Sequence, residues 1–292
     1  CLSLLGLARD LNFFFEFKNN LNIYEGQLKD FNFDFINHEP NACPEINFLY
    51  LEIENEVNSY KDYLESYFLD LPNNKVNFFT DISNYVSYEL GQPTHCYDFS
   101  SIQGTLELKK IDKKKDFITL QDEKITIDED DLVFSINDEI VNLAGIMGGR
   151  GTRCNDKTTK ILLECAHFRP NEILGKSTKY GLNSDASHKF ERFVDPAIQE
   201  LAIKRFIKIV EEHADIKEIK LYKNSNTKHS ERIIEFNPSK INSILGTRLD
   251  DKKIIKILNN LFFDTIENKV RVPSFRNDIL NENDIAEEIA RV

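Results

Sequence analysis

Residues 105–146 carry five short segments in which polar and apolar residues alternate: TLELKK (105–110), DFITLQ (116–121), KITI (124–127), LVFSI (132–136) and IVNLAGI (140–146). A period of two places one face of a strand in a core and the other face in solvent. Asp, Lys and Gly residues separate the segments, as they do in turns between strands. The stretch therefore predicts a β-rich region built of several short strands.

Further strand and helix patterns surround this region. Helical periodicity predicts helices over 59–70 and 76–90, and Gly91 and Pro93 end the second. Asp195-Pro196 predicts a helix start, because an N-cap residue is followed by proline at the first helical position. Strand patterns recur in INFLYLEI (46–53), ILLECAHF (161–168) and KEIKLYK (217–223). The predicted fold class is α+β, a mixed domain with a β-rich sheet flanked by helices.

The end of the chain predicts a separate small unit. Its patterns follow the order strand, helix, helix, strand, strand, helix over 231–292. The polar segment KNSNTKHS (223–230) predicts a linker before it. We therefore divide the chain into residues 1–22, a domain over 23–224 and a small unit over 229–292. The chain begins with Cys1 and stops inside a helical pattern, so we expect it to be a piece of a longer protein.

Composition excludes several classes of protein. The 292 residues carry 37 Lys and Arg against 49 Asp and Glu, and the net charge of −12 argues against a surface coated with phosphate-binding groups. No uncharged apolar run approaches the roughly 20 residues that span a bilayer. Five scattered cysteines without a CxxC pair are typical of reduced intracellular thiols. We expect a cytoplasmic protein that does not contact a membrane.

Two titratable residues stand out as candidates for chemistry. His95 follows a proline in GQPTHCYD (91–98), where an imidazole in a pocket would donate hydrogen bonds or transfer a proton. Glu164 interrupts the apolar run ILLECAHF, and a buried carboxylate needs a partner such as a ligand hydroxyl. The structural alternatives are a loop histidine bound to backbone and a structural salt bridge for the glutamate.

Small residues mark two further candidates. Ser184 and Ala186 lie in GLNSDASHKFER (181–192), where small side chains suit a wall that a ligand approaches closely, although an ordinary capped loop is the alternative. The glycine cluster in GIMGGRG (145–151) would allow close backbone approach to a ligand or a phosphate, and a tight turn is the alternative. The lysines at 109, 110 and 113–115 predict a solvated hairpin tip rather than a phosphate-binding surface.

An acidic segment near the end of the chain is a candidate metal site. In DILNENDIAEE (278–288), three carboxylates share one face of a helix if it begins near residue 284. Such carboxylates, with water, are typical ligands of Mg²⁺. Acidic residues also favour the positive N-terminus of a helix without any metal. The group comprises Asp278, Asp284, Glu287 and Glu288.

Several of these segments together resemble one family. NYVSYELGQPTHCYD, LAGIMGGRGTRCNDKTTKILLECAHFRP, GLNSDASHKFERFVDP and VPSFRNDILNENDIAEEIARV are similar, in order and spacing, to the beta subunit of bacterial phenylalanyl-tRNA synthetase. The resemblance implies that residues 1–22 are the remnant of a preceding module. It implies that 23–224 is the combined third and fourth module, a tRNA editing domain. Residues 229–292 would be most of the fifth, winged-helix-like module.

The resemblance also implies a function and a set of site residues. The editing module of this family hydrolyses tyrosine wrongly attached to tRNA(Phe), because the synthetic site rejects an extra hydroxyl poorly. Glu164 would bind the tyrosine hydroxyl, and His95 would help to position the ester or the attacking water. Ser184, the third catalytic candidate, stands where a threonine is common and keeps the hydroxyl. The substrate pocket would be lined by Ala186, Gly145 and Ala144.

The resemblance implies partners and cofactors as well. The synthetic active site of the family lies in the alpha subunit, which would use ATP and complete a Mg²⁺ site with Asp278, Asp284, Glu287 and Glu288. The parent enzyme would pair two alpha with two beta subunits and bind tRNA(Phe). We expect the piece alone to be a monomer in which this Mg²⁺ site is weak or empty.

One departure from the family pattern supports a second hypothesis. Asn74 stands where the family often has an arginine that would anchor the tRNA end, and the adjacent Lys75 is a candidate substitute. Arginine and lysine are not equivalent in phosphate recognition. The alternative function is therefore a non-catalytic scaffold that docks tRNA and the other subunit.

Overall fold

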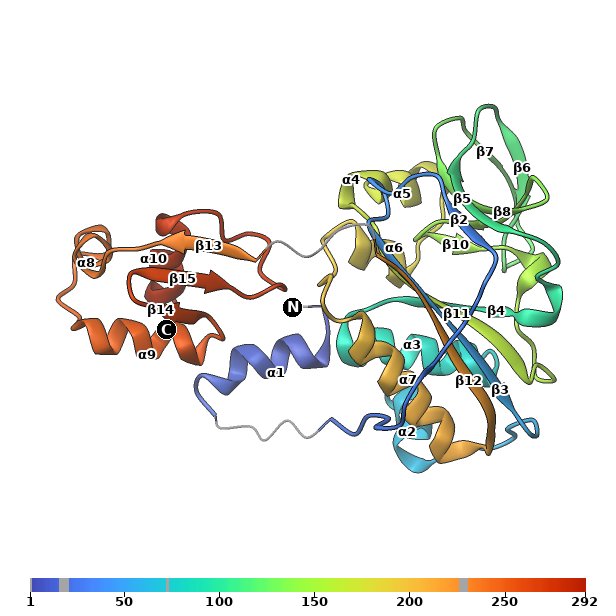
Figure 1. The fold of residues 1–292 in the computed structure, drawn as a ribbon, viewed down its shortest axis with the longest axis horizontal. Coiled ribbons are helices and arrows are strands. Elements are labelled where there is room, and N and C mark those ends of the chain that lie inside the picture. The colour runs from blue at the N-terminus through green and yellow to red at the C-terminus, as the bar shows by residue number, and fades with distance from the viewer. Residues whose placement is uncertain (1, 16–20, 72–73, 226–230) are drawn as a thin grey trace. The chain divides into compact units, whose positions relative to one another are not determined.

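The computed structural model describes residues 2–15, 21–71, 74–225 and 231–292 (Figure 1). The chain forms two compact units. The larger unit comprises Leu21–Val194 and Ile198–Thr227, and the smaller unit comprises Cys1–Asn20, Asp195–Ala197 and Lys228–Val292. Helices and sheets occur in both units, which confirms the predicted α+β class.

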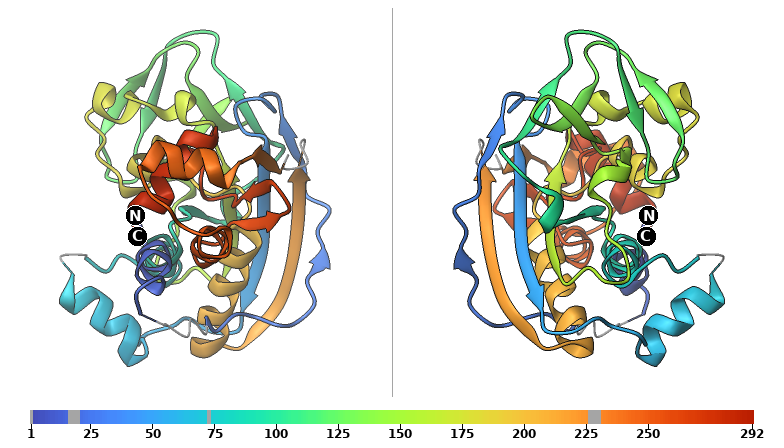
Figure 2. Two further views of the ribbon diagram at one scale, coloured as in Figure 1. Left: turned by 90° about the vertical axis from the view of Figure 1, so that its left-hand side faces the viewer. Right: turned by 90° about the vertical axis from the view of Figure 1, so that its right-hand side faces the viewer.

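Sheet A of the larger unit is built around a long strand from the predicted segment 46–53. That strand pairs antiparallel with its neighbours on both sides, and Figure 2 shows it alongside β12 over most of its length. Every residue from Ile46 to Leu51 is buried, because both faces of the strand are covered. The five strands, in spatial order, are β1 (Lys29–Asp30), β12 (Ile216–Ser225), β3 (Glu45–Ile53), β11 (Lys160–His167) and β4 (Thr94–Asp98).

Sheet B contains most of the predicted short strands. Its order is β10 (Met147–Gly148), β9 (Glu139–Leu143), β8 (Leu132–Ile136), β5 (Leu106–Lys110) and β2 (Phe35–Asn37). A separate antiparallel pair joins β6 (Lys115–Ile118) to β7 (Lys124–Ile127). The alternating segment therefore folds as predicted, but it divides between two sheets.

Helices cover one face of sheet A. Helix α3 (Phe78–Leu90) begins at Asn77, whose side chain accepts from the N–H of Thr80, and ends at Gly91 with φ 82°. Arg205 of helix α7 (Gln199–His213) pairs with Glu89 of α3 at 2.6 Å. The remaining helices of the unit are α2 (Asp62–Asp70), α4 (Pro170–Ile173), α5 (Lys176–Tyr180), α6 (Asp185–Phe190) and α7 (Gln199–His213), with short 3₁₀ turns at η1 (Phe99–Ser101) and η2 (Arg150–Thr152).

The opposite face of sheet A packs against sheet B. Phe48 of β3 meets Phe35 of β2 with ring centroids 4.8 Å apart, and Phe134 of β8 lies 6.5 Å away. Asn47, the next residue along β3, points to the other face and donates to Gln199 of α7 at 2.6 Å. Alternation along β3 therefore separates a sheet-to-sheet core from a sheet-to-helix core.

The smaller unit confirms the predicted order of its elements. Its sheet runs β13 (Arg232–Glu235), β15 (Lys269–Val272), β14 (Asp264–Ile266), and its helices are α1 (Leu4–Asn12), α8 (Pro238–Leu245), α9 (Asp251–Asn260) and α10 (Glu282–Ala290). Phe13 packs against the core of this unit, and the Arg9 guanidinium lies 4.2 Å from the ring centre of Phe275. The residues at the start of the chain thus belong to the same compact unit as those at its end.

Two predictions about boundaries were wrong. Asp195-Pro196 does not start a helix, because the Asp195 carboxylate accepts from the N–H of Ala197 and closes a local turn, while α7 begins at Gln199. The predicted linker overlaps β12 up to Ser225, where pairing with Glu45 extends the strand. Residues 226–230 of that linker lie outside the described residues. No helix among the described residues is long and apolar enough to cross a membrane.

We expect Phe48→Ala to lower the free energy of unfolding by about 3–5 kcal/mol, because it removes a fully buried ring between the two sheets. Urea denaturation followed by circular dichroism measures the change. Leu69→Ala, at a position 82% exposed on α2, is the control and shifts the free energy by less than about 0.5 kcal/mol. Equal effects of the two substitutions would contradict this account of the core.

Candidate functional site

Strand pairing brings Glu164 and His95 together. In the antiparallel register between β11 and β4, Glu164 lies directly opposite His95. Side chains at opposed positions project from the same face of a sheet, with Cβ atoms about 4.5–5.5 Å apart. Both residues therefore face sheet B and lie within reach of one small ligand. His167, three residues along β11, instead meets the ring of Phe193.

Two side chains hold the Glu164 carboxyl. The Tyr97 hydroxyl donates to Oε2 at 2.6 Å, and Nδ2 of Asn142 donates to the same oxygen at 3.3 Å. Asn142 also donates to the Tyr97 hydroxyl at 2.8 Å. In the part of the chain that the structure describes, Oε1 makes no hydrogen bond, and Glu164 lines a small cavity.

Burial keeps both titratable residues uncharged near neutral pH. Burial raises the pKa of Glu164 to about 8, although the hydrogen bonds from Tyr97 and Asn142 act in the opposite direction. Burial lowers the pKa of His95 to about 4. Nε2 of His95 is buried and has no hydrogen-bond partner among the described residues. The imidazole is therefore neutral, and no protein group among those residues pairs with this nitrogen.

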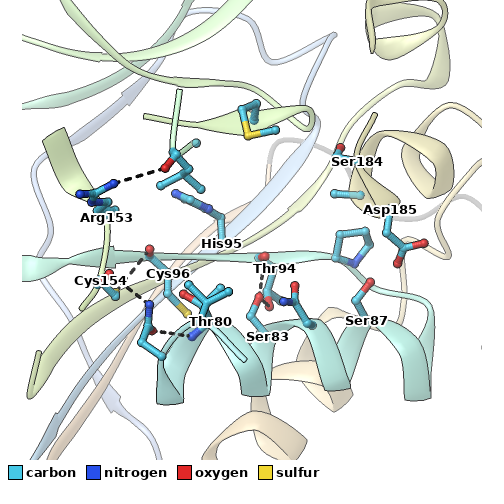
Figure 3. Close-up of a pocket in the computed structure, with 18 of the residues that line it drawn as sticks. Thr80, Ser83, Ser87, Thr94, His95, Cys96, Arg153, Cys154, Ser184 and Asp185 are labelled. Atoms are coloured by element: carbon cyan, nitrogen blue, oxygen red, sulfur yellow. Dashed lines mark hydrogen bonds between the residues drawn. The ribbon is translucent and has the colours of Figure 1, made fainter. Parts of the chain in front are cut away.

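Two neighbouring cavities share His95 in their lining, and Glu164 lines the smaller of the two. An outer pocket of about 450 Å³ is lined by α3, β4, the glycine segment and the start of α6. An inner pocket of about 60 Å³ shares His95, Gly148 and Ala186 with it and ends at Glu164 and Asn142. In Figure 3 the His95 ring lies on the opposite side of β4 from Thr94 and Cys96, which face α3. The site is therefore a large pocket with a small neighbouring pocket, and Glu164 and Asn142 line the small one.

The glycine segment makes close contact with His95. A Cβ on Gly148 would lie 2.3 Å from Cε1 of His95, so only glycine fits there beside the imidazole. Gly145 has φ 69° and lines the inner pocket. A Cβ on Gly151 would meet no atom within 4 Å. The glycine cluster therefore allows the backbone at Gly148 to approach the His95 side chain closely.

Ser184 and Ala186 contribute differently to the pocket. Ser184 lines the outer pocket, but its Oγ accepts from the N–H of Ser187 and caps α6. Ala186 lines both pockets, and its small side chain takes up little of the space beside them. Ala144 lines neither pocket, and its N–H pairs with the carbonyl of Leu132. The structure thus brings together His95, Glu164, Gly145, Ser184 and Ala186, but not Ala144.

The residues proposed to anchor tRNA lie outside the pocket lining. Asn74 is exposed, and Lys75 pairs with Glu65 and covers the ring of Tyr60 at 4.6 Å. Arg153 is the only Lys or Arg among the described lining residues of the outer pocket, and it donates to Asp122 at 3.2 Å. Sequence reasoning missed Arg153, because its position at the pocket depends on a bridge to Tyr97 from a distant segment.

The pocket offers no activated nucleophile among its described residues. Burial raises the pKa of the Cys96 and Cys154 thiols, which disfavours the thiolate. Oγ of Ser83 bonds to Thr94 at 2.7 Å. The chemistry that this arrangement permits is therefore selection of a polar group and orientation of a water.

The predicted lysine group is neutralised by carboxylates, as expected of a surface hairpin rather than a phosphate site. Four of its lysines form ion pairs at 2.6–3.1 Å. These pairs are Lys109 with Glu107 and Asp138, Lys110 with Glu172, Lys114 with Asp128, and Lys115 with Asp138.

The acidic group of the smaller unit does not fit a magnesium site as it stands. Arg276 pairs with both Asp278 and Glu288, and it holds the pKa of Asp278 below the ordinary value. Oδ2 of Asp284 accepts from the N–H groups of Leu280 and Asn281 and caps α10, while Glu287 is exposed. Across the described residues no group of three or more His, Cys, Asp or Glu side chains could hold a metal.

Comparison with known proteins agrees with this architecture. Residues 43–215 match the B3/4 domain, and residues 234–292 match the tRNA synthetase B5 domain. Over 225 residues the chain is 32% identical to the phenylalanine–tRNA ligase beta subunit of Francisella tularensis, covering 74% of this chain and 28% of that protein. For the same subunit of Clostridium tetani, identity is 37% over 228 residues, with 74% and 28% covered.

A solved structure is also similar. It is an N-terminal fragment of the phenylalanyl-tRNA synthetase beta subunit from Pyrococcus horikoshii, with a TM-score of 0.45 and 14% identity over 97% of this chain and 80% of that one.

The two matched domains define the class, a tRNA synthetase segment with a B3/4 domain followed by a B5 domain. The chain belongs to the phenylalanine–tRNA ligase beta-subunit family. It spans about 28% of the length of the curated relatives it matches. The family membership that the sequence motifs predicted is therefore confirmed.

We expect Gly148→Ala to displace the His95 ring, because the added methyl group would lie 2.3 Å from Cε1. A ring pushed toward the outer pocket gains solvent, so its pKa rises from about 4 toward its ordinary value. Histidine ring signals followed by NMR against pH measure the change. The matched control is Gly151→Ala in the same cluster, and an identical titration of His95 in both variants would refute the contact.

The raised pKa of Glu164 predicts that the free energy of unfolding depends on pH. Its pKa is raised from 4.5 to about 8 in the folded chain, so ionisation favours unfolding. The stability that Glu164 contributes is present below pH 4.5 and is lost as pH rises toward 8. Glu164→Gln lacks this loss, so its free energy of unfolding relative to wild type increases with pH, by at most about 1.4 kcal/mol per pH unit. Urea denaturation at pH 5 and pH 7.5 measures the difference, and a constant difference would contradict the burial of a titrating carboxyl.

Proposed function

We propose that the larger unit is an editing module that hydrolyses tyrosine wrongly esterified to tRNA(Phe), within the beta subunit of a phenylalanine–tRNA ligase. One observation carries the proposal: a small pocket beside a larger one, lined by Glu164 and by His95 directly opposite it. A polar group at the end of a narrow pocket selects for a ligand that brings a matching polar group.

Discrimination follows from the cost of leaving Oε1 of the Glu164 carboxyl unpaired. A tyrosine side chain in the inner pocket would place its hydroxyl against the available Oε1. Phenylalanine would leave Oε1 of that carboxyl buried without a partner, at a cost of roughly 1–3 kcal/mol. A site that hydrogen-bonds the substrate hydroxyl therefore rejects the analogue that lacks it more strongly than an apolar pocket does.

Hydrolysis in this proposal uses water rather than a protein nucleophile. Water adds to the ester carbonyl carbon, the bond from that carbon to the ribose oxygen breaks, and a proton passes to the ribose oxygen. His95 is neutral and its Nε2 lacks a partner among the described residues, so it can orient the water or the ester by one hydrogen bond. Ser184 acts as a wall of the outer pocket and holds α6 in place.

The wider assembly is also part of the proposal. The beta subunit would pair with an alpha subunit, two of each, in the cytoplasm, and the alpha subunit would bind ATP and charge tRNA(Phe) with phenylalanine. Arg153, at the outer pocket, is the candidate contact for a phosphate of the tRNA end in place of Asn74. A Mg²⁺ site shared with the alpha subunit would require Arg276 to release Asp278 and Glu288.

A non-catalytic scaffold remains the second candidate, and two observations favour it. Tyr97 already donates to Glu164, so a protein hydroxyl occupies one oxygen of the proposed selector. Lys75, the candidate substitute for the family's arginine, pairs with Glu65. A scaffold would dock tRNA and the alpha subunit without releasing any amino acid.

Deacylation assays separate the two candidates. We expect the full two-subunit enzyme to release tyrosine from Tyr-tRNA(Phe) and to leave Phe-tRNA(Phe) intact. Glu164→Ala should lose the selectivity by about tenfold or more, because the selecting hydrogen bond is gone. His95→Ala should slow release by roughly 10²-fold.

The controls use the same enzyme. His38→Ala changes a histidine 48% exposed in the same unit and should leave release unchanged. Absence of tyrosine release from the wild-type enzyme would instead support the scaffold.

A further inference from the structure

Tyr97 contacts both residues of the proposed selecting site. It is fully buried on β4, two residues after His95, so the two side chains project from the same face of the strand. Their rings meet edge to face, with centroids 4.4 Å apart and planes at 85°. The ring of Tyr97 therefore limits how far the imidazole can tilt.

The hydroxyl of Tyr97 decides which carboxyl oxygen is available. It donates to Oε2 of Glu164 at 2.6 Å and accepts from Asn142 at 2.8 Å. Asn142 comes from sheet B, whereas the other two residues come from sheet A, so the three side chains join the sheets across the inner pocket. Both donors use the same oxygen, and a rotation of the carboxyl would break both hydrogen bonds.

We propose that Tyr97 is a positioning residue that sets the specificity of the pocket: it ties Oε2 of Glu164 and braces His95, so that Oε1 alone is offered to the hydroxyl of a para-hydroxylated aromatic ring. The identity of this ligand rests on the proposed function. The positioning itself rests only on the contacts of Tyr97 with Glu164, His95 and Asn142.

The titratable groups around the Glu164 carboxyl stay neutral near pH 7, so the titration of Glu164 can be followed by itself. His95 faces Glu164 from β4, and the thiols of Cys43 and Cys165 sense its charge. Burial raises the pKa of both thiols and lowers that of the imidazole, so all three stay neutral near pH 7. The hydrogen bond from Tyr97 lowers the pKa of Glu164 against the larger effect of burial. Its removal should therefore raise that pKa further.

The test compares Tyr97→Phe with Tyr50→Phe. The second variant removes a hydroxyl that also donates to a glutamate of sheet A, Glu52, at 2.9 Å, but lines neither pocket. Carbon-13 NMR of labelled glutamate carboxyls, with the Glu164 signal assigned from Glu164→Gln, follows the titration. We expect the midpoint for Glu164 to move up by about one pH unit in Tyr97→Phe and not in Tyr50→Phe.

A second readout is hydrolysis by the full two-subunit enzyme. Tyr97→Phe should lower the preference for Tyr-tRNA(Phe) over Phe-tRNA(Phe) about tenfold, mainly through a higher KM for the tyrosyl substrate, while Tyr50→Phe keeps the preference. The pH dependence of the preference should shift in the direction of the NMR midpoint. A purely structural role of Tyr97 would lower the activity on both substrates equally and leave that pH dependence unchanged.

Each outcome decides one proposal. If Tyr97→Phe changes neither the Glu164 midpoint nor the preference, the positioning role is overturned, while a loss of preference in Glu164→Ala alone would still support editing. If the wild-type enzyme releases no tyrosine, the proposed function fails and the NMR midpoint still decides the positioning. Should Tyr97→Phe not fold, Asn142→Ala removes the other donor and should move the midpoint in the same direction.

Discussion

The buried hydrogen bonds between Glu164, Tyr97 and Asn142 are the interaction on which the pocket depends. A carboxyl between two packed sheets is costly to bury, and the two donors offset part of that cost. The same contacts connect sheet A to sheet B at the point where the inner pocket ends. In the proposed function, stability and selectivity both depend on this carboxyl, because the partners that make its burial tolerable also orient its remaining oxygen.

Backbone geometry on both sides of the carboxyl supports this arrangement. The register of β11 with β4 places His95 opposite Glu164, and the absence of a side chain at Gly148 gives the imidazole room. Ala186 presents only a small side chain where it lines the two cavities. Each of these three requirements is met by a different segment, and a small cavity with a polar end results only when all three coincide.

In the smaller unit, an arginine pairs with acidic residues whose spacing alone is compatible with a metal site. The pattern of carboxylates on one helical face is compatible with Mg²⁺ ligation, but Arg276 lies between Asp278 and Glu288 and neutralises both. Asp284 uses its carboxylate to cap the helix that carries it. These carboxylates thus find their partners within the chain. A metal ion would have to compete with Arg276 for Asp278 and Glu288.

The sequence by itself determined the α+β class, the strands at 46–53 and 161–168, the element order of 231–292 and the choice of His95, Glu164 and Ala186. The fold class, the strands and the element order depend on local periodicity, and Glu164 stands out as a single polar residue in an apolar run. His95 and Ala186 were indicated by their place after a proline and among small residues, in motifs that carry the family resemblance. Tertiary structure alone decided the roles of Tyr97 and Asn142, the exclusion of Ala144 and Lys75 from the pocket lining, and the start of α7 beyond Asp195. These depend on which strands pair and which faces meet, and contacts between residues distant in sequence set them, such as the 45 positions between Tyr97 and Asn142.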